Sequence, residues 1–181
     1  MRELCDHAVA AALGAGASYA DARVVVRRSQ VVGTRNQRVE RLDDNETEGI
    51  GVRVLVDGAW GFACDRRLTA EGAEAAAGKA CSFAKAASGG HGRELAAVEP
   101  AEGEFRTAVT RDPFEISLAD KVELCLRAER ALAHDDVKVT SASVRAQREH
   151  KVFVSSEGAA VEHELVECGG GIDALAARDG V

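Results

Sequence analysis

The chain has 181 residues, of which 46% are hydrophobic, 29% are charged and only 4% are aromatic. A chain of this length buries about 70% of the surface that its unfolded form exposes, so we expect a single domain, 1–181, with a core of Ala, Val and Leu. The net charge of −7 and the lack of a basic cluster argue against nucleic-acid binding, and no apolar run approaches the ~20 residues that span a membrane.

The cysteines are odd in number, and no two of them have the spacing of a metal knuckle: Cys5, Cys64, Cys81, Cys125 and Cys168. Several lie among apolar residues, which favours buried, reduced thiols. The N-terminus has acidic residues where a signal peptide would have an apolar segment. These features predict a cytoplasmic protein.

The first third of the chain predicts one helix followed by an antiparallel meander of about four strands. The helix covers 3–14, where apolar residues recur on one face and glycines follow. A Val-rich strand covers 20–34, and Asn36-Gln37 is a plausible turn before a return strand at 38–47.

Residues 49–65 carry the clearest hairpin signal in the chain. Apolar side chains fall on every second position at Ile50, Val52, Val54 and Val56. The Asp57-Gly58 dipeptide suits a two-residue type I′ turn, because both turn positions need positive φ. The return strand carries Trp60 and Phe62, which we name as candidate contact residues, although a lone Trp on a hairpin often packs in the core.

The rest of the chain alternates helices and strands. Thr69 can cap a helix that runs to Ala87, and Ser117 can cap one that runs to about His134. Between them, 93–115 has no clear period and predicts an extended surface connection. We expect strands at 137–149, 151–155, 160–168 and 172–177, with Gly169-Gly170-Gly171 as an interruption.

The elements together predict an α+β fold, in which antiparallel meanders carry about three helices on the sheet. Their order suggests a weak repeat of one α-plus-meander unit. Asp179-Gly180 is a further turn signal with no return strand after it. We therefore expect the natural polypeptide to continue.

No constellation of residues in this chain predicts catalysis by itself. The histidines are His7, His91, His134, His150 and His163. His163-Glu164 begins the H-E-x-x-H pattern of zinc peptidases, but no second His follows and the stretch is β-like. A cysteine-dependent enzyme using Cys64 or Cys168 lacks any indicated base partner. We therefore predict no catalytic, metal or cofactor site in this chain.

The stretch from Val39 to Ala63, with Glu48-Gly49-Ile50-Gly51-Val52-Arg53-Val54 and Asp57-Gly58-Ala59-Trp60-Gly61-Phe62-Ala63, resembles the N-terminal region of the TldD/PmbA metallopeptidases, also called the "modulator of DNA gyrase" family. Ala20-Asp21-Ala22-Arg23 is similar to the opening of that region. Residues 148–158 resemble the hairpin that leads toward its second domain.

The resemblance implies a longer enzyme whose zinc site, with the motif H-E-x-x-x-H, lies in a C-terminal domain that no position here matches. It implies peptide hydrolysis inside a chamber formed by a homodimer or heterodimer, with zinc as the cofactor of that absent domain. Two hypotheses follow. The chain is the non-catalytic N-terminal part of such an enzyme, with the catalytic domain or subunit as its partner, or it is a stand-alone protein-interaction module derived from the family.

Overall fold

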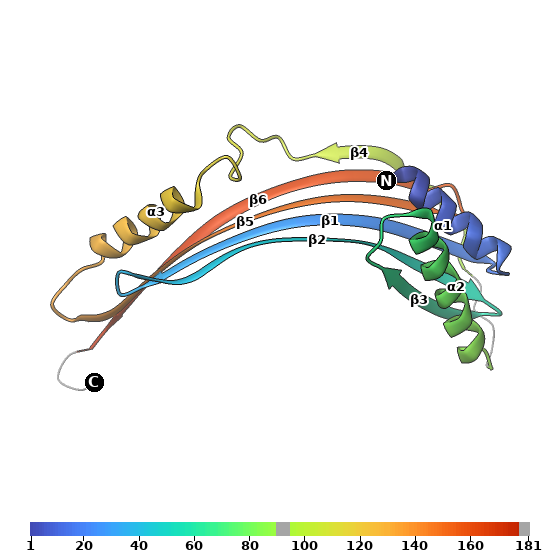
Figure 1. Ribbon diagram of the computed structural model, residues 1–181, viewed down its shortest axis with the longest axis horizontal. Coiled ribbons are helices and arrows are strands. Elements are labelled where there is room, and N and C mark those ends of the chain that lie inside the picture. Colours follow the sequence, from blue (N-terminus) through green and yellow to red (C-terminus); the bar gives the residue numbers. More distant parts are fainter. Residues whose placement is uncertain (90–94, 178–181) are drawn as a thin grey trace. The chain divides into compact units, whose positions relative to one another are not determined.

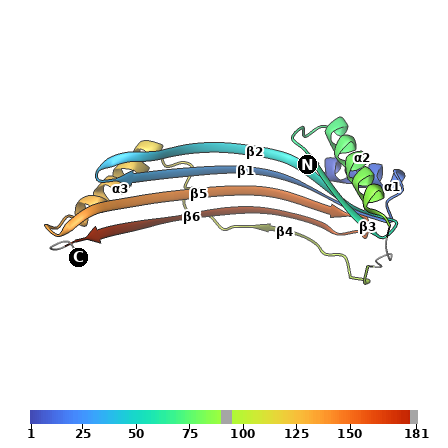
Figure 2. The same cartoon turned by 90° about the horizontal axis from the view of Figure 1, so that it is seen from below.

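The computed structural model describes residues 1–89 and 95–177, which form three helices and six strands. In chain order these are α1 (Arg2–Gly14), β1 (Tyr19–Arg35), β2 (Arg38–Val56), β3 (Ala59–Asp65), α2 (Ala70–Ala87), β4 (Glu102–Arg106), α3 (Leu118–Ala131), β5 (Val137–Ser155) and β6 (Ala160–Ala176) (Figure 1). The strands pair in the order β3-β2-β1-β5-β6-β4 (Figure 2). The predicted α+β class with three helices is confirmed.

Several predicted interruptions of the strands do not exist. The strand expected at 38–47 continues into the hairpin as β2, so β1, β2 and β3 make three strands instead of about four. The strands expected at 137–149 and 151–155 are one strand, β5. Polar residues and glycines obscure the alternation in the sequence, but hydrogen bonding to a neighbouring strand keeps the backbone extended through them.

The predicted glycine interruption is also absent, because β6 runs through Gly169–Gly171. A Cβ atom at Gly170 would lie 2.9 Å from the Ser143 carbonyl oxygen. The glycine therefore permits a close approach of β5 and β6 where the sequence pattern indicated a break.

The turns and helix caps follow local sequence rules. Asn36 and Gln37 have φ values of +48° and +63°, and Asp57 and Gly58 have +48° and +74°. Both dipeptides thus form the tight turns that were predicted. The Thr69 hydroxyl accepts a hydrogen bond from the Gly72 amide at 3.2 Å, so this predicted cap is confirmed. The predicted cap at Ser117 is confirmed in the same way.

Two other predictions need correction, and a third lies outside the described residues. Within 93–115, expected to be an extended connection, Glu102–Arg106 forms β4, which pairs in parallel with residues 160–164 of β6. The helix predicted to reach His134 ends at Ala131. The predicted Asp179-Gly180 turn lies outside the described residues.

The described chain divides into two compact units, to which β1, β2, β5 and β6 all contribute. The first unit comprises Met1–Arg27, Thr47–Arg106 and Glu149–Glu164. The second unit comprises Arg28–Glu46, Thr107–Arg148 and Leu165–Val181. None of the helices in the described residues combines the length and hydropathy that crossing a membrane requires.

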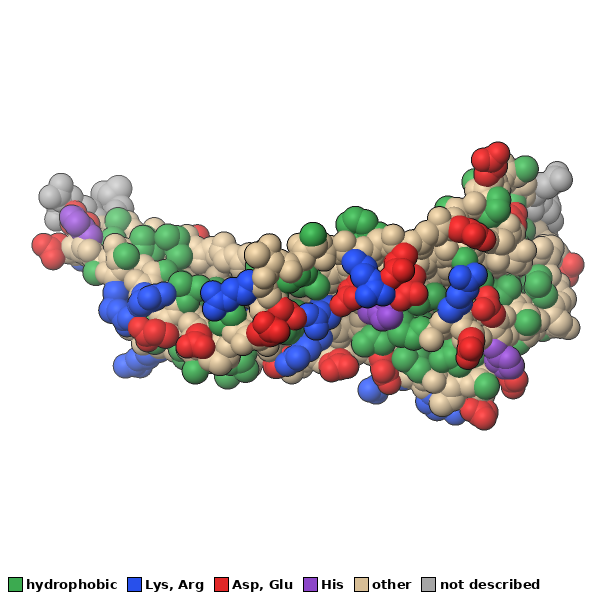
Figure 3. Space-filling view, turned by 90° about the horizontal axis from the view of Figure 1, so that it is seen from above, with side chains coloured by type: hydrophobic (Ala, Val, Ile, Leu, Met, Phe, Trp, Pro, Cys, Tyr) green, Lys and Arg blue, Asp and Glu red, His purple; other side chains and the backbone are tan. Residues whose placement is uncertain are grey.

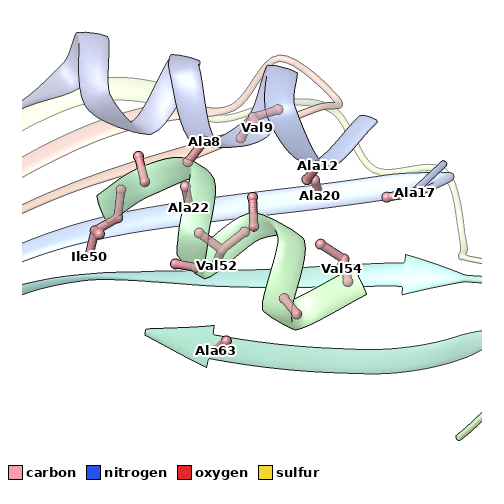
Figure 4. Close-up of a cluster of buried hydrophobic side chains, with 14 of the residues drawn as sticks. Ala8, Val9, Ala12, Ala17, Ala20, Ala22, Ile50, Val52, Val54 and Ala63 are labelled. Atoms are coloured by element: carbon pink, nitrogen blue, oxygen red, sulfur yellow. The ribbon is translucent and has the colours of Figure 1, made fainter. Parts of the chain in front are cut away.

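In the first unit, α1 and α2 pack on one face of the sheet (Figure 4). The strands bury Val24, Val52 and Val54, and the helices meet them mainly with alanines such as Ala8 and Ala80. Small side chains let the helices approach the sheet closely. The approach is tightest at Gly61 of β3, where a Cβ atom would lie 2.0 Å from the Ala80 carbonyl oxygen.

In the second unit, α3 packs on β1 and β5 around Val32, Cys125 and Ala142. The fully buried Glu129 of α3 adds polar contacts to the β1–β2 turn and to β5. Its Oε2 accepts hydrogen bonds from the Gln37 amide at 2.8 Å and from the Thr140 hydroxyl at 2.7 Å. A buried carboxylate with these partners holds the β1–β2 turn and the start of β5 against the helix.

Replacing Gly61 with alanine tests the close approach of α2 to β3. We expect Gly61→Ala to lower the free energy of unfolding by about 2 kcal/mol or more, because the new methyl group overpacks the contact. On the exposed side of α2, a Cβ atom at Gly78 would meet no other atom within 4 Å. Gly78→Ala should therefore raise the free energy by about 0.5–1 kcal/mol. Urea unfolding measures the free energy of unfolding of both variants. Equal changes in the two variants would contradict a close contact between α2 and β3 at Gly61.

Candidate functional site

The face of the first unit opposite α1 and α2 carries arginine, aromatic and carboxylate side chains. Strand alternation sends Ala20, Ala22 and Val24 toward the helices and the intervening residues of β1 to this other face. We call it the open face and define it by Tyr19, Asp21, Arg23, Arg53, Trp60, Phe62, Glu149 and Phe153.

A fully buried carboxylate, Asp21, organises one part of the open face. Its Oδ1 accepts a hydrogen bond from Arg23 at 3.1 Å, and its Oδ2 accepts one from Arg53 at 2.7 Å. Both arginine side chains remain nearly half exposed. Two guanidinium groups thus compensate one buried charge and keep their outer edges available to solvent.

The candidate Trp60 packs within this network. Its ring meets Tyr19 edge to face, with the ring centroids 5.8 Å apart. The Arg53 guanidinium lies over the same ring at 4.9 Å. Burial and the nearby Asp21 carboxylate raise the pKa of Tyr19. Trp60 therefore helps to hold Arg53 in place, and only part of its surface is accessible.

The second candidate, Phe62, is more accessible. Its side chain is 56% exposed and lies over Gly51, where a Cβ atom would come within 3.2 Å of the ring. Phe62 lines a groove of about 370 Å³ together with Arg23, Arg27, Cys64 and others. The structure thus brings Trp60 and Phe62 onto one face, with Phe62 as the exposed aromatic group of the two.

A second buried carboxylate, Glu149, lies on β5 of the same unit. It accepts hydrogen bonds from Arg27 at 3.0 Å and from Lys151 at 3.2 Å. The Arg27 guanidinium lowers the pKa of Glu149 to about 2 against the opposing effect of burial, and Lys151 acts in the same direction. The sequence analysis did not single out Asp21, Arg53 or Glu149. Asp21 lies in a stretch, Ala20-Asp21-Ala22-Arg23, that carries the family resemblance, but a charged residue between two alanines gives no sign that it is buried.

The residues that the structure describes do not fit a zinc ion. His163 Nε2 lies 3.5 Å from Glu149 Oε1, but Arg27 and Lys151 already occupy that carboxylate. His7 and His150 each pair with one carboxylate, and His91 lies outside the described residues. Within 1–89 and 95–177, no three His, Cys, Asp or Glu side chains are placed to share a metal, whereas zinc sites use at least three protein ligands.

The cysteines divide into buried and exposed thiols, none of them in a disulfide. Cys81 and Cys125 are buried, in agreement with the prediction for cysteines that lie among apolar residues. Burial raises the pKa of both and that of Cys5, the last to about 11, so these thiols are poor nucleophiles. Cys64 and Cys168 are exposed.

Two successive domain models of one family match the chain. Residues 20–84 match the PmbA/TldA metallopeptidase domain 1, and residues 111–181 match the PmbA/TldA metallopeptidase central domain. Among curated proteins, a metalloprotease from Synechocystis is 32% identical over 77% of this chain and 31% of its own length. A metalloprotease from Methanocaldococcus jannaschii is 23% identical over 83% of this chain and 34% of its own length. The chain thus spans about a third of these relatives.

Solved structures show the same fold. A Bacteroides thetaiotaomicron protein named as a modulator of DNA gyrase superposes with a TM-score of 0.82 at 16% identity, over 98% of this chain and 41% of that one. TldE from Thermococcus kodakarensis superposes with a TM-score of 0.73 at 14% identity, over 98% of this chain and 40% of that one. Since both domain models belong to one family and together match most of the sequence, the chain belongs to the PmbA/TldD metallopeptidase family.

Proposed function

We propose that this chain is the N-terminal, non-catalytic part of a zinc metallopeptidase that cleaves peptides, and that it contributes to the substrate chamber and to assembly. The match to the first and central domains of the family carries this proposal. The named relatives are metalloproteases about three times as long as the matched region, which leaves room for a separate catalytic domain.

The chemistry of the described residues agrees with a supporting role. The buried carboxylates Asp21 and Glu149 are already neutralised by arginine and lysine side chains, so neither is available as a zinc ligand or as a general base. The zinc ion and the hydrolytic water would belong to the catalytic domain or subunit. The chain's own contribution would be a preformed surface, the open face, held by ion pairs and aromatic contacts.

A stand-alone interaction module is the second candidate function. The exposed Phe62 beside a groove favours it, because an accessible aromatic group next to arginines is typical of contact surfaces. Both hypotheses use the same face, and they differ in the partner.

We also propose that the protein acts in the cytoplasm, since its five cysteines are all free thiols. On the face shown in Figure 3, basic side chains lie beside acidic ones.

The purified chain should not cleave peptides. We expect no hydrolysis of unstructured peptides above background, with or without added zinc, because the described residues offer no ligand set for the ion. Mass spectrometry of the peptides after incubation measures this, with a complete family metallopeptidase as the positive control. Rapid cleavage that a chelator abolishes would disprove the non-catalytic role.

Affinity capture from cells that produce the chain separates the two functions. We expect the tagged chain to retain a polypeptide that bears H-E-x-x-x-H, identified by mass spectrometry. Phe62→Ser should reduce this capture by about tenfold, as loss of an aromatic contact does at an interface. Phe83→Ser is the matched control, because Phe83 is a similarly exposed Phe on α2 of the same unit. Capture of an unrelated protein alone would instead favour the interaction module.

A further inference from the structure

The groove beside Phe62 in the first unit runs along β2 at a place where that strand has no side chains on the open face. Gly49 and Gly51 form its floor, and its volume is about 370 Å³. A Cβ atom at Gly51 would lie 3.2 Å from the Phe62 ring and 3.9 Å from Arg23 Cγ, so β3 and β1 supply its two walls. We call it the arginine groove and define it by Arg23, Arg27, Arg66, Gly49, Gly51 and Phe62. It follows the direction of the strands, and so it has room for an extended peptide.

The side chains on the walls of the arginine groove are cationic or uncharged. Two acidic residues also line it, but they belong to the other face of the sheet. Asp65 pairs directly opposite the buried Ile50, and its carboxylate accepts hydrogen bonds from Arg67 at 3.0 and 2.8 Å. Glu48 is two positions from Ile50, so strand alternation places it on the same face as that residue. The open side of the groove therefore presents guanidinium groups and an aromatic ring, which favour an anionic ligand.

Arg23 and Arg27 are held in place and still have hydrogen-bond donors available. Within the described residues, Arg23 donates one hydrogen bond, to Asp21, and it lies over the Phe153 ring at 5.4 Å. In the same part of the chain, Arg27 donates two hydrogen bonds, both to Glu149. A guanidinium has five N–H donors, and these two arginine side chains are 44% and 48% exposed. Because both side chains are ordered before a ligand arrives, binding costs little conformational entropy.

The spacing of the two arginines sets the spacing of the charges that they can bind. Arg23 and Arg27 are four positions apart on β1, so they share the open face, with their Cα atoms about 13 Å apart. An extended peptide has the same repeat, and its side chains at positions i and i+4 also share a face. Two carboxylates at this spacing can each pair with one guanidinium. A single carboxylate, such as the C-terminus of a peptide, can reach only one of them.

The charge and the position of the arginine groove favour a substrate peptide as its occupant. Non-specific attraction does not account for an acidic ligand, because the whole chain has a net charge of −7 and repels it. Phe62, the contact proposed for the catalytic polypeptide, forms one wall of the groove. Ligand sites commonly lie where two domains meet, so a groove that begins beside this contact suits the peptide that the assembled enzyme would hold.

We propose that the arginine groove binds substrate peptides that carry two Asp or Glu side chains four positions apart. The peptide lies extended above the glycine floor, its carboxylates pair with Arg23 and Arg27, and Phe62 contacts an apolar side chain between them. Arg66, which follows β3, adds positive charge at the end of the groove. This assignment rests on the proposed function, because only a wall of the substrate chamber meets substrate peptides.

Blocked peptides test this proposal on the purified chain, and the test does not require cleavage. The probe is a nine-residue peptide of glycine, serine and valine with glutamate at positions 3 and 7, fluorescently labelled at its N-terminus and amidated at its C-terminus. One control peptide has its two glutamates adjacent, and the other has glutamine at both positions. By fluorescence anisotropy, we expect the probe to bind at least about tenfold more tightly than either control. Equal binding of the probe and the adjacent-glutamate peptide would overturn the proposal.

The two exposed thiols of the chain locate the bound peptide. Cys64 lines the arginine groove, whereas Cys168 lies in the second unit. Saturating probe should slow the alkylation of Cys64 by iodoacetamide several-fold and leave that of Cys168 unchanged, as measured by mass spectrometry. Equal protection of both thiols, or protection of neither, would refute binding in the groove.

A charge reversal tests the protein side of the contact. Arg66→Glu should weaken binding of the probe by about threefold or more, because it replaces a cation of the groove with an anion. Lys79→Glu is the matched control, since it makes the same charge change on the exposed side of α2, across the sheet from the open face. An equal loss of affinity in both variants would reduce the interaction to net charge and contradict a specific site.

The alkylation assay also separates a failure of this proposal from a failure of the proposed function. Specific binding of the probe to the chain supports the arginine groove whether or not the chain captures a polypeptide that bears H-E-x-x-x-H. If such a captured polypeptide, or a second copy of the chain, protects Cys64 and excess probe does not displace it, the groove belongs to a protein interface. That result would overturn the assignment of the groove to substrate peptides.

Discussion

The close contact of α2 with β3 is the constraint on which the first unit depends. Gly61 leaves no room for a side chain against the Ala80 carbonyl, and alanines line most of the buried face of the helix. A core with so few aromatic residues gains stability from many small, close contacts. The same closeness puts every second residue of β2 and β3 into the core, and so assigns Arg53, Trp60 and Phe62 to the opposite face.

The open face holds its charged side chains in ion pairs. Each buried carboxylate on it is compensated by two cationic side chains, Asp21 by Arg23 and Arg53, and Glu149 by Arg27 and Lys151. Losing one cation would leave a buried charge only partly compensated, which is costly. The network therefore holds its arginines in defined positions, and a partner would meet a surface that is already ordered. Such an ordered surface suits the proposed role as a chamber wall or a docking surface better than a role as a reaction centre.

The family assignment and the absence of a zinc-binding set among the described residues are consistent with each other. The chain matches two domains of metallopeptidases while spanning about a third of the relatives' length. In such a protein, catalysis can reside in one domain and structural support in another, because zinc-dependent hydrolysis needs only a compact set of ligands.

The sequence by itself determined the α+β class, the three helices, both tight turns and the strand that carries Trp60 and Phe62. These depend on local rules, namely side-chain caps, positive φ at Asn36-Gln37 and Asp57-Gly58, and alternation along one strand. Only the tertiary structure decided that β2, β5 and β6 are continuous, that β4 pairs in parallel, and that Asp21 and Glu149 are buried. Arg27 and Glu149 are 122 positions apart, so no local pattern reveals their pairing. Strand continuity and charge burial depend on neighbours that are distant in the sequence, and folding alone brings these together.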